Sequence, residues 1–356
     1  MRDGKIVLGI IGCGKVSDFA HFPALTQIDG CVIKYACDLI IDRARLRQQQ
    51  YPGKVENVIT DYHIALADPE VDAVYVLTPV TSHREISIDA LRAGKHVFCE
   101  KPISYTYEMA KEMEAEAEKA GKLLNIGVCN RYHKSVELLE QMNRDGAFGE
   151  IYHVYCSFRC FRSIPQLGGA YTTRKLSGGG VLIDWGIHFF DLIFYVLGGV
   201  QFKTVTCDTY AKLAKNIADY KYTDMYAGPA DPKGINDVEE MVSGYIRTDK
   251  ASISFNGAWA QNIDHEDMFI DFMGDKGGAR LTYGDTFEFF TVRDGVLQRV
   301  EPKYKMRKHY EVEDEAFMEA IRKGEKTRAY ISNILESQRI LDLLYASAGK
   351  RAEVCL

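Results

Sequence analysis

The first 145 residues alternate short, β-branched apolar runs with longer helical patterns, and no other feature of the sequence restricts the fold as strongly. Such alternation predicts parallel β-α-β units. The expected strands are mostly apolar, as strands covered by helices on both faces tend to be, and they span residues 6–11, 32–37, 71–78, 96–99 and 123–128. The clearest expected helix spans residues 105–120 and ends at Gly121, because glycine readily adopts the left-handed conformation beyond a last helical turn.

From about residue 151 apolar and polar positions alternate, which predicts a sheet with one buried face. The expected strands span residues 151–158, 202–206, 239–247, 251–259 and 269–273, and we expect the last three to pair antiparallel as a meander. The aromatic and proline-containing segment 212–235 is expected to form a long loop, and the periodicity of residues 330–348 predicts a helix. The predicted fold class is α/β plus α+β. We expect a doubly wound dinucleotide-binding domain over residues 1–130 and an α+β domain for substrate binding and oligomerisation over residues 131–356. The second domain contains a largely antiparallel open sheet, and its final helical segment can pack back on the first domain.

Charge and cysteine content exclude several classes of protein. Fifty acidic residues against 44 basic ones give a net charge of −6, which repels a nucleic acid backbone unless the basic residues are strongly segregated. Nine scattered cysteines without a C-x-x-C pair indicate neither a disulfide framework nor a zinc finger, and they suit a reducing cytoplasm. We find no export signal and no run of the roughly 20 apolar residues that a membrane span needs. We therefore expect a cytoplasmic protein that binds neither nucleic acid nor membrane.

A glycine-rich loop follows the first expected strand. Residues 12–17 read G-C-G-K-V-S, which is a G-x-G-x-x-G pattern with serine in the last place. The first glycine permits a tight turn, the second lets the backbone approach a pyrophosphate, and the next helix presents its positive end to that charge. A purely structural glycine turn is the alternative. The predicted dinucleotide-binding residues of this loop are Gly12, Cys13, Gly14, Lys15 and Val16.

Asp38 follows the second expected strand, at roughly the 20-residue offset where a carboxylate accepts hydrogen bonds from the adenosine ribose hydroxyls. A carboxylate at this position repels a 2′-phosphate, and Leu39 follows in place of an arginine that would receive one. NAD is therefore favoured over NADP as the cofactor. A carboxylate that merely caps a strand-end turn is the alternative.

Glu100, Lys101 and Pro102 follow the fourth of these expected strands. The carboxyl ends of strands in an open parallel sheet face the ligand crevice, so we expect Lys101 to point at a bound ligand. Pro102 restricts the backbone of Lys101, because a residue before proline avoids the helical region. A surface charge pair at a strand-to-helix turn is the alternative.

Asp184 and His188 lie four residues apart, shortly after three glycines at positions 178–180. On a helix this spacing puts both side chains on one face, where the acid fixes the tautomer of the imidazole and stabilises its protonated form. A histidine with a reference pKa near ~6.5 is suited to removing a hydroxyl proton at neutral pH. The flanking residues are strongly apolar, so a hydrogen-bonded core histidine is the alternative. The sequence has neither H-E-x-x-H nor G-x-S-x-G, and we expect no metal site and no serine hydrolase.

Residues 12–17, Glu100-Lys101-Pro102 and 178–188, taken in this order, resemble the Gfo/Idh/MocA oxidoreductases, named for glucose-fructose oxidoreductase and inositol dehydrogenase. The similarity extends over nearly the whole chain, including T-P-V-T-S-H at residues 78–83, A-G-K-H-V at 93–97 and the segment 333–349. The resemblance implies an N-terminal Rossmann domain and a C-terminal domain with a largely antiparallel sheet. Ser17 departs mildly from the glycine or alanine of the family pattern, and Tyr171 stands near a position where many relatives have tryptophan.

The resemblance also implies roles for single residues. Lys101 would lie beside nicotinamide and substrate, and Asp184 with His188 would complete the catalytic set. Glu100 would lie near the nicotinamide ribose, and Thr78, Pro79 and His83 would line the dinucleotide cleft. The residues implied to contact the substrate are Lys101, Arg131, Arg162, Asp184 and His188.

The implied activity is NAD-dependent oxidation of a secondary hydroxyl of a sugar, glycoside or cyclitol, with C3 of a hexose or glycoside ranked above inositol. His188 would take the hydroxyl proton while Asp184 orients its ring, and the Lys101 ammonium would stabilise charge on the oxygen. Two alternatives stay open: NAD-dependent glycoside cleavage by transient oxidation and elimination, and a non-catalytic dinucleotide-binding regulator. We expect a homodimer or homotetramer, formed through an apolar open face of the second sheet.

Overall fold

In the computed structural model, which describes residues 1–284 and 286–356, the chain divides into two units. The first contains Met1–Tyr132 and Arg307–Gln338, and the second contains His133–Met306 and Arg339–Leu356. The sequence-based division at residue 130 stays a prediction about folding domains. The segment 307–338 belongs to the first unit, although 174 residues of the second unit separate it from residue 132 in the sequence.

The first unit is built on a six-stranded parallel sheet with strand order β3-β2-β1-β4-β5-β6. The strands are β1 (Ile6–Ile11), β2 (Cys31–Cys37), β3 (Val55–Ile59), β4 (Ala73–Val76), β5 (His96–Glu100) and β6 (Leu124–Gly127). All residues of β1, β4 and β6 are buried, as their apolar sequences predict. The predicted doubly wound domain is confirmed. The edge strand β3 was not predicted, because its sequence V-E-N-V-I exposes Glu56 and Asn57.

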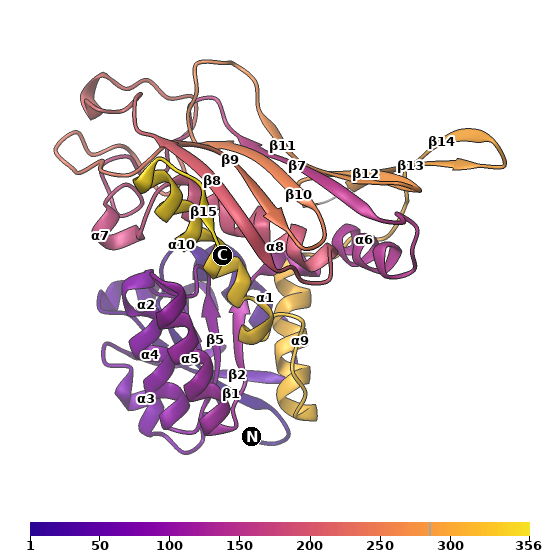
Figure 1. Cartoon of the computed structure of the whole chain (residues 1–356). Coiled ribbons are helices and arrows are strands. Elements are labelled where there is room, and N and C mark those ends of the chain that lie inside the picture. The colour runs from indigo at the N-terminus through magenta and orange to yellow at the C-terminus, as the bar shows by residue number, and fades with distance from the viewer. Residues whose placement is uncertain (285) are drawn as a thin grey trace. The chain divides into compact units, whose positions relative to one another are not determined.

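Helices cover both faces of this sheet (Figure 1). α4 and α5 pack against each other, and α9, from the C-terminal part of the unit, packs against α1. The unit's helices are the π-helical turn η1 (Ser17–His21), α1 (Phe22–Leu25), α2 (Ile41–Gln50), α3 (His63–Ala67), η2 (Val80–Ser82), α4 (His83–Arg92), α5 (Tyr107–Ala120), η3 (Cys129–Tyr132), α9 (His309–Lys323) and η6 (Ile331–Asn333). α5 ends at Gly121 in the left-handed conformation, as predicted.

The second unit is built on a nine-stranded sheet of order β14-β13-β12-β11-β7-β10-β9-β8-β15, antiparallel except where β7 and β10 run parallel. The strands are β7 (Ile151–Arg159), β8 (Phe202–Tyr210), β9 (Met241–Thr248), β10 (Ser252–Ala258), β11 (Asp267–Gly274), β12 (Gly277–Thr282), β13 (Thr286–Arg293), β14 (Val296–Val300) and β15 (Val354–Cys355). The predicted largely antiparallel sheet is confirmed. The predicted meander is wrong in one respect: β9 and β10 pair, but β11 pairs with β7 and β12, because β7 lies between β10 and β11.

The remaining helices are α6 (Lys134–Arg144), α7 (Arg174–Ser177), the π-helical turn η4 (Leu182–Gly186), α8 (Ile187–Val196), η5 (Ile217–Asp219) and α10 (Leu335–Lys350), which contains the boundary between the units. α8 packs against α6 and β7 (Figure 1). Residues Arg174–Val196 are long and apolar enough to cross a membrane by length and composition, but 78% of the apolar window is buried within the protein. This segment is therefore the core helix of the second unit.

The face of the second sheet opposite α8 carries an ordered polar network. The two ring nitrogens of His153 lie 2.8 Å from the Ser252 hydroxyl and 3.1 Å from the Ser254 hydroxyl. Asn256 donates to the Tyr155 hydroxyl over 2.9 Å. Strand alternation predicted an apolar face here, whereas the face is polar and aromatic with hydrogen bonds made within the sheet.

A buried carboxylate from outside the helix caps the start of the core helix. Glu239 is 3% exposed, and its Oε1 accepts the backbone N–H groups of Gly180 (2.9 Å) and Leu182 (3.3 Å) and the hydroxyl of Tyr345 (2.7 Å). A Cβ on Gly180 would collide with the carbonyl oxygen of Glu239. The glycine run therefore lets the chain pass close to Glu239, whose negative charge satisfies N–H groups that the first helical turn leaves unpaired.

We predict that Glu239→Ala destabilises the second unit by about 2–4 kcal/mol, because it leaves two helix-start amides and the hydroxyl of the half-buried Tyr345 without their acceptor. Both tryptophans of the chain, Trp185 and Trp259, belong to this unit, so urea unfolding followed by tryptophan fluorescence measures the effect directly. The control is Glu353→Ala, which removes an exposed partner of Arg247 and should change stability by less than about 1 kcal/mol. Equal unfolding midpoints for the two variants would show that the cap contributes nothing.

Candidate active site

The loop after β1 fits a dinucleotide phosphate site. Gly12 has φ +100°, and a Cβ there would lie 2.6 Å from the backbone carbonyl of Leu77, so only glycine fits. At Gly14 a Cβ would meet nothing within 4 Å, which leaves the backbone open to an approaching ligand. Ser17 is buried and donates to the Gly14 carbonyl over 2.8 Å. Lys15 is exposed where the helical turns begin. The structure thus gives the two glycines the different roles that the motif predicts.

Asp38 lies at the end of β2 and holds this loop. Its Oδ2 accepts the Cys13 amide over 2.9 Å, and its Oδ1 accepts the Ile40 amide over 2.8 Å. A carboxylate oxygen has two lone-pair directions, so these contacts leave acceptor capacity for ribose hydroxyls. Leu39 is 90% exposed and carries no charge. Since strand order reverses between β1 and β4, the loop also lies at the switch point where open α/β sheets bind ligands.

Thr78, Pro79 and His83 follow β4 at the same edge of the sheet. Thr78 is half-buried and accepts the Ser82 hydroxyl over 2.8 Å, and Pro79 is exposed. His83 is only 1% exposed, and its ring nitrogens lie 2.7 Å from the Thr78 carbonyl and 2.8 Å from the Pro102 carbonyl. Burial lowers the pKa of His83. The ring joins the turns that follow β4 and β5, so its geometry supports a positioning role, and direct cofactor contact stays a prediction.

Glu100 and Lys101 form the turn after β5. Lys101 is half-buried, and its peptide bond to Pro102 is cis. Glu100 is buried, and its Oε2 accepts the Lys101 amide over 3.0 Å. The other oxygen, Oε1, lies 3.0 Å from Nε2 of His21, a residue that the sequence analysis did not single out. Glu100 is thus bound inside the first unit on both sides, which a surface charge pair would not be.

Arg131 is buried in the first unit. Its guanidinium donates to the carbonyls of Arg328 (2.8 Å) and Asn333 (3.0 Å), in the C-terminal part of that unit. These contacts give Arg131 a structural function within the first unit, and the predicted substrate contact stays a prediction.

Asp184 and His188 lie on one face of the core helix of the second unit. Asp184 and Trp185 lie in the π turn η4 and His188 in α8, and all three are half-buried while Ile183, Gly186, Ile187 and Phe189 are buried. π turns are rare and occur often at functional sites. The helix is buried as predicted, but the acid and the imidazole lie on its most exposed stripe. That placement favours a ligand-binding role for His188 over the role of a hydrogen-bonded core histidine.

Trp259 positions Asp184. Its indole Nε1 donates to Asp184 Oδ2 over 3.3 Å, and Trp259 itself is 1% exposed at the end of β10. The ring of Trp185 lies 6.1 Å from that of Tyr283. Neither Trp259 nor Tyr283 was singled out from the sequence, because a contact across 75 positions leaves no local pattern.

Arg162 lies beside the end of β10, where it forms an isolated bridge with Ala260. Its guanidinium donates to Asn262 and lies 5.5 Å from the Tyr220 ring, in the aromatic loop predicted over residues 212–235. That loop contains the short η5 turn and ends at Ile235 in an isolated bridge to Gly168. Tyr171 packs edge-on against Tyr226 of the same loop at 6.0 Å. The substrate contact predicted for Arg162 stays a prediction.

Two observations concern other kinds of site. Among residues 1–284 and 286–356, no group of three or more His, Cys, Asp or Glu side chains could hold a metal ion.

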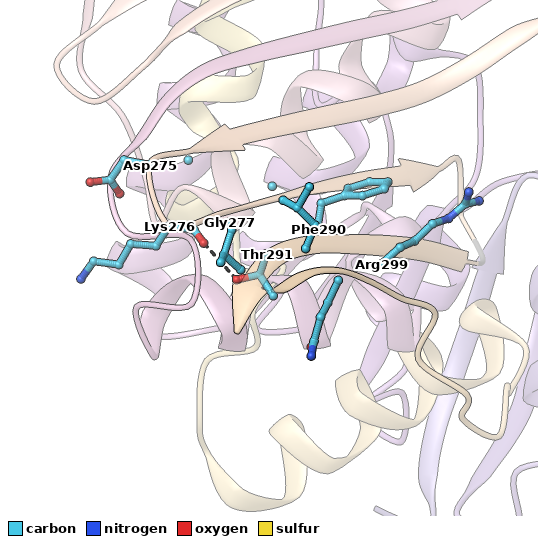
Figure 2. Close-up of a pocket in the computed structure, with 11 residues that line it drawn as sticks. Asp275, Lys276, Gly277, Phe290, Thr291 and Arg299 are labelled. Atoms are coloured by element: carbon cyan, nitrogen blue, oxygen red, sulfur yellow. Dashed lines mark hydrogen bonds between the residues drawn. The ribbon is translucent and has the colours of Figure 1, made fainter. Parts of the chain in front are cut away.

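A concavity of about 510 Å³ lies on β12–β14, where Phe290, Thr291 and Arg299 surround it (Figure 2). None of the predicted site residues lines it.

Known proteins resemble both parts of the chain. The description "Oxidoreductase family, NAD-binding Rossmann fold" matches residues 6–128, and "GFO/IDH/MocA C-terminal domain" matches residues 136–280. The chain is 32% identical over 284 residues to the D-glucoside 3-dehydrogenase of Escherichia coli (strain K12), covering 79% of this chain and 78% of that protein. It is 31% identical over 191 residues to a myo-inositol 2-dehydrogenase of Thermotoga maritima, covering 54% of each.

Solved structures share the fold. A levoglucosan dehydrogenase in complex with NADH and levoglucosan matches with a TM-score of 0.84 at 19% identity, covering 99% of both chains. An aldose-aldose oxidoreductase from Caulobacter crescentus matches with a TM-score of 0.82 at 22% identity, covering 99% of this chain and 100% of that one. At these identities the likeness establishes the architecture alone.

We predict opposite outcomes for the two loop glycines. Gly12→Ala should destabilise the protein by roughly 2–4 kcal/mol, because the new methyl group meets the Leu77 backbone at a positive φ. Gly14→Ala should fold normally but weaken NADH binding roughly tenfold, because the methyl group enters space left for the ligand. Thermal unfolding by circular dichroism and NADH fluorescence titration measure the two effects. If Gly14→Ala bound NADH as tightly as the unaltered protein, the loop would not be the phosphate site.

Proposed function

Because the chain belongs to the GFO/IDH/MocA oxidoreductase family, we propose that it oxidises a secondary hydroxyl of a sugar, glycoside or cyclitol with NAD. Family membership confirms the resemblance read from the sequence, and the chain is a dehydrogenase-type oxidoreductase. The observation that carries the proposal is the 32% sequence identity between this chain and a D-glucoside 3-dehydrogenase, which extends over most of both chains. We therefore rank C3 of a hexose or glycoside first as the position oxidised.

The first unit holds the cofactor in this proposal. Bound NAD supplies the hydride acceptor, and the protein supplies orientation and charge. The open backbone at Gly14 receives the pyrophosphate, and Asp38 receives the ribose hydroxyls. Asp38 together with the uncharged Leu39 favours NAD over NADP, because a 2′-phosphate would meet a carboxylate and no cation there.

The catalytic roles follow from the chemistry of three side chains. His188 accepts the proton of the substrate hydroxyl, and Asp184 orients the imidazole and stabilises its protonated form. The Trp259 indole supports this role because it holds the Asp184 carboxylate through a hydrogen bond from an uncharged donor. Lys101 stabilises negative charge that develops on the substrate oxygen. The half-buried positions of all three groups are compatible with contact to a small molecule.

The deciding experiment is a screen of hexoses, glycosides and cyclitols with NAD and NADP in parallel, in which absorbance at the NADH band and product identity are both recorded. Net NADH with a ketone product at C3 supports the proposal. Glycoside cleavage without net NADH indicates the elimination reaction instead. NADH binding without turnover of any compound indicates a regulator.

We predict that His188→Ala lowers kcat roughly 10²- to 10⁴-fold, the usual size of a general-base contribution, with NADH affinity unchanged. The matched control is His153→Ala, which removes a half-buried histidine from the opposite face of the second unit's sheet. Steady-state kinetics with a substrate from the screen measure both. A His188→Ala enzyme as fast as the control would remove the proposed base.

Assembly and location extend the proposal. We expect a homodimer or homotetramer in the cytoplasm, although the polar outer face of the second sheet replaces the apolar one on which this expectation first rested. Light scattering of the purified protein measures the assembly, and a monomer at micromolar concentration would contradict it.

A further inference from the structure

His21 is enclosed between two acids inside the first unit. It is 0% exposed in the π turn η1, and its Nε2 lies 3.0 Å from Glu100 Oε1 on β5. Its Nδ1 lies 3.1 and 3.3 Å from the two carboxylate oxygens of Asp314 on α9. A neutral imidazole has one N–H and can donate to only one of these acids. When both acids are ionised, each ring nitrogen must carry a hydrogen to make these contacts, and the ring is then the doubly protonated cation.

The surroundings keep this charge away from water. The rings of Tyr75, Phe98 and Tyr310 pack around His21 with centroids 5.5, 5.0 and 5.7 Å away. Burial by itself lowers the pKa of His21, but the carboxylates of Asp314 and Glu100 outweigh it and raise that pKa to about 10. The titratable groups that face the ring are Tyr75 on β4, Glu100 on β5, and Tyr310 and Asp314 on α9.

Glu100 connects this buried charge to the candidate site. One of its oxygens faces His21, and the other accepts the amide of Lys101 over 3.0 Å. A Cβ on Gly127, at the end of β6, would lie 2.7 Å from Glu100 Oε1, so the carboxylate fits closely against the neighbouring strand. Close packing and two hydrogen bonds leave Glu100 one conformation, and the backbone of Lys101 depends on it.

We infer that His21 is a positioning residue for Lys101: the imidazolium joins Asp314 to Glu100, and Glu100 fixes the backbone that carries the Lys101 ammonium. This inference rests on the proposed function. It makes α9, which carries Asp314 at 293 positions from His21, part of the structure that orients the Lys101 ammonium.

The test uses Asp314→Asn and His21→Gln in the full-length enzyme. Asp314→Asn keeps a hydrogen-bond acceptor but removes one negative charge, so the pKa of His21 falls and its charge is lost as pH rises. We expect kcat to fall roughly tenfold at pH 9 and to recover at pH 6, because small displacements of a catalytic group cost at least this much. His21→Gln has no charge at any pH, and its loss of kcat should not recover at pH 6. KM for NAD should change less than twofold in both.

The control is His96→Gln, which alters a half-buried histidine at the opposite end of β5 whose ring accepts the Leu123 amide. It should leave kcat unchanged from pH 6 to pH 9. A deficit in Asp314→Asn that is the same at both pH values, or kinetics like those of His96→Gln, would overturn the inference, because a merely structural contact gives no recovery with pH.

A second measurement is independent of turnover. Lysines are reductively ¹³C-methylated, and the Lys101 resonance is assigned with Lys101→Arg. Asp314→Asn and His21→Gln should shift the Lys101 resonance, and His96→Gln should not. An unshifted resonance in soluble variants overturns the inference even if no substrate is found, whereas an unaltered enzyme that turns over nothing in the screen counts against the proposed function alone. If Asp314→Asn is insoluble, His21→Gln decides by the same two readouts.

Discussion

Acidic side chains that accept backbone amides hold three of the segments that carry the candidate chemistry. Asp38 accepts the Cys13 amide of the glycine loop, Glu100 accepts the Lys101 amide, and Glu239 accepts the first amides of the core helix. A carboxylate that leaves water must recover its hydrogen bonds from the protein, or its burial is costly. Each acid is therefore stable only while its turn keeps one geometry. For the buried Glu100 and Glu239, the cost of losing water therefore favours the turn geometry that keeps these hydrogen bonds.

Two π turns add a second constraint. η1 follows the glycine loop and places His21, and η4 follows the glycine run at 178–180 and contains Asp184. A π turn inserts an extra residue and changes the direction of the side chains around it, at some loss of hydrogen-bond quality. In each unit this irregularity lies directly before a regular helix and carries an ionisable residue that an uninterrupted α-helix would orient differently.

Much of this architecture was predictable, and the failures have a common cause. Periodicity identified β1, β2, β4, β5 and β6 because they are mostly apolar, and the local motifs identified Gly12, Lys101 and His188. Strand β3 and the outer strands β12, β13 and β14 were missed because they are short, glycine-rich or exposed, so neither face gives a clear pattern.

The site residues that escaped prediction are all long-range partners. Glu239 contacts the helix start across 59 positions, Trp259 contacts Asp184 across 75, and Asp314 contacts His21 across 293. The nature of the Trp259 contact matters for the chemistry. An indole N–H fixes the Asp184 carboxylate without adding a positive charge, whereas an arginine or lysine in its place would form an ion pair and offset the carboxylate's charge. In the proposed mechanism, the indole therefore orients the Asp184 carboxylate without itself adding a positive charge, and a carboxylate beside His188 favours the protonated state that a general base must reach.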